Sequence, residues 1–398
     1  MSHPVDDRTA RHNALVLATA QALGGANPAI VVSLGGIVGF TLATDKSLAT
    51  LPVSLLNLGL ALGTIPAALV MRRIGRRGGY FVGATLGVIG AGIAAFGIAR
   101  GSFVLFCLGT LVAGFYASYV QSYRFAAADS ASSAFRPRAI SWVMAGGLLA
   151  GVIGPQTVIW TRDLTPEAPF AASFLGQGVL ALLTIVVVSF LRAAPVPLEA
   201  PKTAGRPLVA IMRQGRFVVA VATGLVSYGM MSFVMTAAPV AMVGCGHSVG
   251  AAALGIQWHV LAMFGPSFFT GRLIGRFGKE AVTGVGLVLI AAAAVVGLSG
   301  LSLAHFWIAL ILLGVGWNFA FIGATALVTD CYRPEERAKV QAANDFLVFG
   351  SVAIASFSSG RILDAGGWEF VNGMVFVPVG LALALLLWQA RPRTTAPA

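Results

Sequence analysis

Apolar residues recur along the chain in long runs separated by short polar segments. Each run has about the 20 residues that an α-helix needs to cross a bilayer. The runs lie near 13–38, 48–71, 79–98, 103–124, 139–161, 171–191, 214–240, 249–270, 280–300, 304–328, 338–360 and 370–390. The pattern predicts an all-α membrane protein with 12 transmembrane helices.

A polar segment from Arg192 to Arg213 divides the twelve runs into two sets of six, and it contains four prolines. Proline and polar residues are typical of linkers. We therefore predict an N-terminal six-helix bundle in residues 1–191, a cytoplasmic linker in 192–213 and a C-terminal six-helix bundle in 214–398.

The basic residues indicate the orientation. With the N-terminus inside, the outer loops keep only Lys46, Arg100, Arg162 and Arg361 of the 26 Lys and Arg. All others, including Arg124 after the fourth run, fall on the inner side, as the positive-inside rule requires. The polar first residues do not resemble a cleaved signal peptide. Both termini are expected in the cytoplasm.

Composition excludes most other classes. Hydrophobic residues make up 57% of the chain and charged residues 10%, and the mean hydropathy is +0.87, which leaves no room for a sizeable soluble domain. The net charge of +12 is dispersed over short loops, so it reflects topology and not nucleic-acid binding. Three scattered cysteines predict neither a metal site nor disulfides.

The motifs of other chemistries are missing or out of place. The chain has no phosphate-binding Gly-x-x-x-x-Gly-Lys-Ser/Thr loop, which an ATP-driven pump would need, and no His-Glu-x-x-His pair. Gly246 to Gly250 match Gly-x-Ser-x-Gly, but they lie between two apolar runs and not between a strand and a helix, as the turn of a hydrolase requires. We expect neither an enzyme nor a cofactor.

Two basic loops repeat at matching places in the two halves. RRIGRRGG begins at Arg72, and GRLIGRFGK begins at Gly271. An aspartate and a short arginine-proline segment follow at matching distances, at Asp129 and Asp330. Glycine permits the tight turn, and the basic side chains can meet helix ends and acidic neighbours. The predicted cytoplasmic gate comprises Arg73, Gly75, Arg76, Asp129, Arg276, Gly278, Lys279, Asp330 and Glu335, with Glu336 as a further acidic neighbour.

This duplicated loop between the second and third helix of each half resembles the major facilitator superfamily, over essentially the whole chain. The resemblance implies two helical bundles with a solute site between them near the membrane midplane, and transport by alternating access. The family's loop usually carries an aspartate where this chain has Arg72 and Gly275. The gate is therefore held by different contacts, or the arginines only determine the orientation of the chain in the membrane.

Polar residues within the apolar runs are the candidates for the solute cavity, because polar groups are costly in a bilayer. They are Gln21, Asn27, Asn57, Tyr116, Tyr119, Gln156, Tyr228, Gln257, Trp258, Trp317 and Asn318. Singly, each also fits a contact between helices. Together they predict a mostly neutral, aromatic cavity for an uncharged or amphipathic organic molecule. No arginine lies in the middle of a run, which argues against a strongly anionic substrate.

Two titratable residues are candidates for proton coupling. Asp345, in the eleventh run, is the one carboxylate within a span, and it lies beside Asn344. A helix-end residue paired with Arg337 or Lys339 is the alternative. His259, near the centre of the eighth run, could exchange a proton in the physiological range. The alternative there is a packing histidine.

The direction of transport has two readings. Gly151 to Pro155 resembles the kink motif of proton-coupled drug exporters, but Val158 and Ile159 stand where its paired glycines belong. Residues 236–278 resemble a proteobacterial branch of the superfamily that includes riboflavin uptake transporters. We expect a monomeric, proton-coupled secondary transporter of the bacterial inner membrane that takes up riboflavin or a similar vitamin. An exporter of drugs or metabolites is the alternative.

Overall fold

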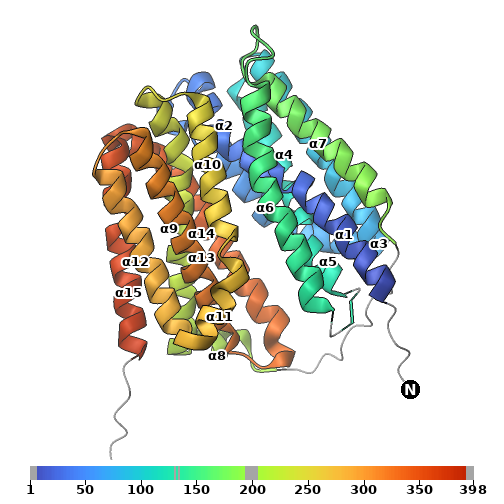
Figure 1. The fold of residues 1–398 in the computed structure, drawn as a ribbon, viewed down its shortest axis with the longest axis vertical. Helices are drawn as coiled ribbons and strands as arrows, with labels where there is room; N and C mark the ends of the chain where they lie inside the picture. The colour runs from blue at the N-terminus through green and yellow to red at the C-terminus, as the bar shows by residue number, and fades with distance from the viewer. Residues whose placement is uncertain (1–6, 130, 133–134, 193–204, 391–398) are drawn as a thin grey trace, which may run out of the picture.

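The computed structural model describes residues 7–129, 131–132, 135–192 and 205–390, and these residues form helices and no strands (Figure 1). The first half comprises α1 (Asp7–Gly24), α2 (Ala26–Leu42), η1 (Lys46–Leu48), α3 (Leu51–Ala99), α4 (Phe103–Gln121), α5 (Tyr123–Asp129), α6 (Arg136–Thr161) and α7 (Ala171–Ser189). The second comprises α8 (Leu208–Met212), α9 (Gly215–Gly244), α10 (Val249–Phe264), α11 (Ser267–Phe277), α12 (Lys279–Leu298), α13 (Leu303–Thr329), η2 (Pro334–Glu336), α14 (Arg337–Gly373) and α15 (Phe376–Ala390).

Nine helical stretches of the described chain are long and apolar enough to cross a membrane, or ten when the bent pair α10 and α11 counts as one. Two stretches contain a reversal of the chain. A straight helix with the 49 residues of α3 would be about 74 Å long, against about 30 Å for a bilayer core. It is interrupted at Gly75, and α14 is interrupted at Gly367, both with positive φ.

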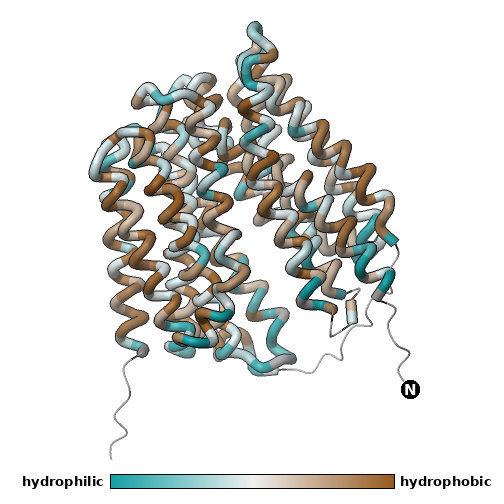
Figure 2. Tube along the Cα trace, in the orientation of Figure 1, coloured by the Kyte–Doolittle hydropathy of each residue, from teal (hydrophilic) through white to brown (hydrophobic). Residues whose placement is uncertain are grey.

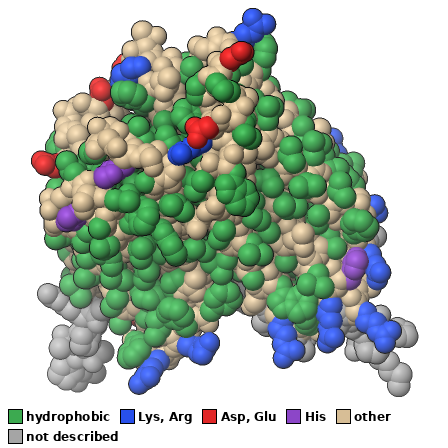
Figure 3. Space-filling model, turned by 45° about the horizontal axis from the view of Figure 1, so that its top comes forward, with side chains coloured by type: hydrophobic (Ala, Val, Ile, Leu, Met, Phe, Trp, Pro, Cys, Tyr) green, Lys and Arg blue, Asp and Glu red, His purple; other side chains and the backbone are tan. Residues whose placement is uncertain are grey.

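The outer surface is apolar. Large hydrophobic side chains such as Val104, Ile65 and Ile354 are about 70% exposed or more. Hydrophobic residues run along the middle of the helices in Figure 2, and hydrophilic ones gather towards their ends. In Figure 3 hydrophobic side chains cover the middle of the face, and Lys and Arg line its lower edge. Such a surface fits lipid and not water.

Small residues let matching helices approach closely in both halves. A Cβ on Gly90 of α3 would meet the backbone of α4 at Ala113, and a Cβ on Gly286 of α12 would meet the backbone of α13 at Ala320. Close approach through small residues is the usual way in which membrane helices pack. The duplicated loops of the sequence are therefore flanked by similarly packed helix pairs.

The helices form two groups that diverge towards one end of the molecule (Figure 1). We call this end, where α1 begins and α15 ends, the terminal end. At the opposite, joined end, the halves are in contact. Thr50 Oγ1 of the first half donates to the Ser356 carbonyl at 3.1 Å, and Ser54 Oγ donates to Ser356 Oγ at 3.2 Å. Gly36 packs against Val240. The interface is thus closed at one end only.

Candidate functional site

A cavity of about 200 Å³ lies between the two halves. Its walls come from α1 to α6 of the first half and from α9, α10 and α14 of the second. Most of the lining is apolar, and its polar side chains are Gln21, Asn57, Gln121, Arg124, Tyr228 and Ser232.

Tyr228 and Phe264 are the aromatic residues of the lining, and three rings hold Tyr228 in place. Its ring meets Trp317 edge-on at 5.1 Å between centroids, Phe321 at 5.0 Å and Phe349 at 6.0 Å. Trp317 in turn stacks on Phe321 at 5.3 Å. Edge-to-face packing at these distances is favourable. The C-terminal half therefore presents a fixed aromatic surface to the cavity.

Two lining residues have polar atoms without a partner. Within the described part of the chain, Asn57 Nδ2 and Ser232 Oγ make no hydrogen bond although both atoms are buried. Leaving a buried polar group unpaired costs about 1–3 kcal/mol. Since the two residues come from opposite halves, one bound solute could satisfy both. Ser232 was not among the sequence candidates, although it lies one helical turn after Tyr228 on α9.

Arg124 also lines the cavity. The charge pattern placed it in a cytoplasmic loop and left the cavity without an arginine. In the structure Arg124 lies on α5, which follows directly on α4. Its side chain is exposed at the terminal end of the cavity. The cavity therefore carries a positive charge that the sequence did not predict.

Several other polar residues that the sequence suggested for the cavity lie behind its lining or form hydrogen bonds with other residues of the protein. Asn27 donates to the Ala113 carbonyl at 3.0 Å and accepts from Gln177. Tyr116 and Tyr119 are buried and pack against Gly87 and Gly83. These side chains hold helices of the N-terminal half together.

The candidates of the C-terminal half are similarly dispersed. Asn318 donates to the Met263 carbonyl at 2.6 Å, at the bend between α10 and α11. Gln156 donates to Gln257 at 2.9 Å and so joins the two halves. Trp258 is 43% exposed and does not line the cavity. Gln21, Asn57 and Tyr228 are the sequence candidates that line it.

The two candidates for proton coupling have different surroundings. His259 is fully buried, and its Nδ1 lies 2.7 Å from the Leu310 carbonyl oxygen. It does not line the cavity. Asp345 is exposed, accepts a hydrogen bond from Asn344 at 3.2 Å and lies within the electrostatic influence of Arg124. Of the two, only Asp345 is accessible to water.

The duplicated loops form similar ion pairs. Gly75 and Gly278 both have positive φ, at 77° and 89°. Directly after them, Arg76 pairs with Asp129 and Lys279 pairs with Asp330. Each pair stays within its own half. The pairs therefore brace each half and do not join the halves at the terminal end.

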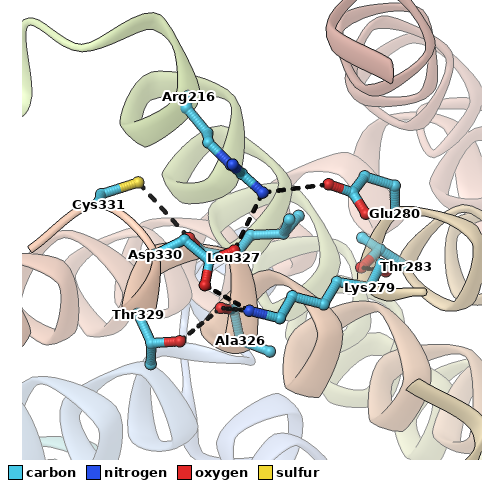
Figure 4. Close-up of polar contacts among 9 residues, drawn as sticks. All are labelled: Arg216, Lys279, Glu280, Thr283, Ala326, Leu327, Thr329, Asp330 and Cys331. Carbon is cyan, nitrogen blue, oxygen red and sulfur yellow. Dashed lines mark hydrogen bonds and ion pairs between the residues drawn. The ribbon is translucent and has the colours of Figure 1, made fainter. Parts of the chain in front are cut away.

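The C-terminal brace is the larger one (Figure 4). Lys279 Nζ lies 2.5 Å from Asp330, and Arg216 lies 3.0 Å from Asp330 and 3.4 Å from Glu280. Among the remaining gate candidates, Arg73 and Glu335 are exposed, and the Arg276 guanidinium lies 5.2 Å from the Phe277 ring.

Glu336 belongs to a separate contact with the linker. Arg206 Nη2 donates to its carboxylate at 2.8 Å, and the Arg333 amide donates at 2.9 Å. These hydrogen bonds hold the pKa of Glu336 well below its usual range. Of the predicted linker, residues 193–204 lie outside the described residues, and the part from Gly205 on packs against the C-terminal half.

An all-helical, lipid-facing fold with a cavity between two halves is typical of a membrane transporter. The profile of the Major Facilitator Superfamily matches residues 14–355 and 267–398, in two overlapping segments. The chain belongs to the major facilitator superfamily, and the resemblance stated from its loops is confirmed. It is a transporter of the bacterial inner membrane and not an enzyme.

Two relatives support this placement, and a solved structure shares the fold. The chain is 59% identical to the riboflavin transporter RfnT of Brucella anthropi over 98% of this chain and 99% of that protein. It is 30% identical to the uncharacterized MFS-type transporter YdeG of Bacillus subtilis, over 94% and 89% of the two chains. The crystal structure of the nucleoside transporter NupG matches with a TM-score of 0.70 and 13% identity, over 96% and 98%. This last match shows the fold alone.

Proposed function

We propose that the protein takes up riboflavin across the inner membrane by alternating access. The observation that carries the proposal is the cavity in which the aromatic surface of Tyr228 lies near two polar groups without partners, Asn57 and Ser232. The full-length likeness to a riboflavin transporter at 59% identity supports the same substrate.

The chemistry of riboflavin suits this lining. Its isoalloxazine ring is planar and uncharged, with hydrogen-bonding atoms along one edge, and its ribityl chain carries hydroxyl groups. A ring of this kind gains from stacking on Tyr228. Its polar atoms would satisfy Asn57 and Ser232, and the hydroxyl groups would find further partners in Gln21 and Gln121.

The proposed topology has 12 transmembrane helices, in bundles 1–191 and 214–398 joined by a linker in 192–213. The reversals at Gly75 and Gly367 support counting α3 and the α14–α15 stretch as two spans each. The arginine-rich loops around Arg76 and Arg276 support a cytoplasmic position of the terminal end, by the positive-inside rule. The cavity then faces inwards, and the chain works as a monomer.

We assign proton coupling to Asp345 in preference to His259. A coupling group has to exchange its proton with water, and Asp345 is exposed near the cavity mouth whereas His259 is enclosed by protein. The braces around Asp129 and Asp330 would keep each half rigid as the two halves rock, with Arg73, Arg276 and Glu335 at the surface of the gate.

Riboflavin uptake into proteoliposomes, with and without an imposed proton gradient, tests the function. We expect gradient-dependent accumulation by the wild type. Tyr228→Leu and Ser232→Ala should each weaken binding about 2- to 10-fold, because each removes one favourable contact. Trp258→Leu is the matched control, since that ring lies outside the cavity. Equal losses in all three variants, or no uptake by folded wild-type protein, would overturn the assignment.

A further inference from the structure

Arg124 is a charged cavity residue without a described ion-pair partner. Its neighbour Tyr123 is fully buried and packs edge-on against Tyr80 at 4.7 Å, which anchors the backbone of α5. The Arg124 guanidinium lies 4.8 Å from the Phe125 ring. The side chain is thus attached to a fixed base, and its five N–H donors remain available at the cavity.

Arg124 and Tyr228 line the same cavity from opposite halves. Asp345 on α14, also in the second half, lies within the electrostatic influence of Arg124. No ion pair within 4.0 Å joins Arg124 to Asp345 among the described contacts. A solute stacked on Tyr228 therefore lies between a guanidinium from the first half and an aromatic surface from the second.

We propose that Arg124 is a specificity-determining residue that binds the carbonyl-bearing edge of the planar solute stacked on Tyr228. The proposal rests on the flavin transport proposed above and adds the group that reads the ring. A guanidinium matches two adjacent acceptors with two parallel N–H donors. The pyrimidine edge of a flavin ring offers such acceptors, and its apolar dimethyl edge offers none.

The same charge creates a requirement when the cavity closes at the terminal end. An arginine that loses its water without gaining a partner is costly to enclose. In the loaded protein the carbonyl edge of the solute supplies acceptors. In the empty protein the facing carboxylate is Asp345, and closure brings the two halves, and so this pair, together. Asp345 is therefore the counter-charge of Arg124 in the empty, closed state.

Equilibrium binding of riboflavin to the purified protein, followed by flavin fluorescence, tests the first part. Arg124→Gln should raise the Kd about 10- to 100-fold, as expected for a lost hydrogen bond to a charged group. The Kd of Arg124→Lys should lie between those of the wild type and Arg124→Gln, because lysine keeps the charge but lacks the planar pair of N–H donors of arginine. Arg77→Gln is the matched control: Arg77 also rests beside a ring, Phe81 at 5.9 Å, but does not line the cavity.

Transport without a proton gradient tests the second part. Asp345→Asn should lower the ratio of net downhill riboflavin uptake to counterflow, because only net uptake requires the empty protein to close. The double variant Arg124→Gln, Asp345→Asn should recover the wild-type ratio of net uptake to counterflow while its affinity stays low. A coupling role of Asp345 alone predicts no such recovery.

The outcomes separate the claims. An unchanged Kd in Arg124→Gln, with normal wild-type binding, overturns the assignment of Arg124 and leaves riboflavin transport standing. A double variant whose ratio stays low overturns the pairing with Asp345. If folded wild-type protein binds no riboflavin, both the proposed function and this inference fail.

Discussion

The two ends of the interface between the halves are built from different chemistry. At the joined end, hydroxyl groups of Thr50, Ser54 and Thr236 surround Ser356, and all four residues are buried. At the terminal end, Arg124 and Asp345 are exposed on opposite halves. The contacts around Ser356 are made by neutral, short side chains, whereas the terminal end has charges of opposite sign on the two halves.

The difference bears on how each end opens and closes. Neutral hydroxyl groups can exchange their partners for water at little net cost, because a typical hydrogen bond contributes only about 0.5–1.5 kcal/mol. Charges can be enclosed only when they are paired. The joined end is thus suited to opening without ions, and the terminal end closes only when its charges are matched by a solute or by each other.

The largest expected effect comes from breaking the joined end. In Gly360→Val the new side chain would meet Thr50 and the Ser47 carbonyl, because Gly360 packs directly against the first half. Overpacking of this kind costs about 1–3 kcal/mol, which corresponds to about a 5- to 150-fold shift away from the state in which the joined end is closed. Riboflavin uptake in proteoliposomes should fall accordingly.

Gly350→Val is the control for that experiment. Gly350 lies on the same helix, α14, with open space where its Cβ would stand. Both variants change helix propensity alike, so a similar loss in the two would place the defect in the helix and not in the joined end.

A smaller effect is expected from the braces near the terminal end. Asp330→Asn removes the shared partner of Lys279 and Arg216 and leaves Arg216 only Glu280, whereas Asp129→Asn removes the partner of Arg76. These pairs are partly exposed, so each contributes about 0–1 kcal/mol. Asp330→Asn should lower the melting temperature by more than Asp129→Asn. The reverse order in thermal unfolding would show that the extra arginine adds nothing.

The smallest effect concerns pH and the linker contact at the terminal end. The pKa of Glu336 lies below its usual range because Arg206 donates to the carboxylate. Its stabilisation is complete above the unfolded-state pKa of about 4.3, and it is lost as the pH falls through the lower folded-state value. The gap in melting temperature between wild type and Glu336→Gln should therefore be equal at pH 7 and pH 5.5. A gap that shrinks within this window would contradict the lowered pKa.

The sequence predicted those features that depend on local pattern. The apolar runs predicted helices. The repeated loops drew attention to Gly75 and Gly278 and to the charged residues next to them that form ion pairs. Family membership followed from the same loops. These features are legible because a membrane span and a tight turn each impose their own local requirements on residue type.

The lining of the cavity depended on tertiary structure and was only partly predicted. Asn27 and Asn318 are polar and lie within spans, yet they turn towards backbone carbonyls because buried amides need partners. Ser232 is too small to stand out in an apolar run. Arg124 belongs by charge to a loop, and only the packing of α5 against α4 and α6 brings it to the cavity.

A thermal-stability screen of the purified protein in detergent tests most simply whether the cavity binds riboflavin selectively. The panel would contain riboflavin, nucleosides, amino acids, sugars and lipophilic cationic drugs. A ligand that binds only the folded state stabilises it by RT ln(1 + [L]/Kd). We expect a selective rise in melting temperature with riboflavin, and a smaller rise in Tyr228→Leu. Rises with several unrelated lipophilic cations and none with riboflavin would contradict it and indicate an exporter with a permissive cavity.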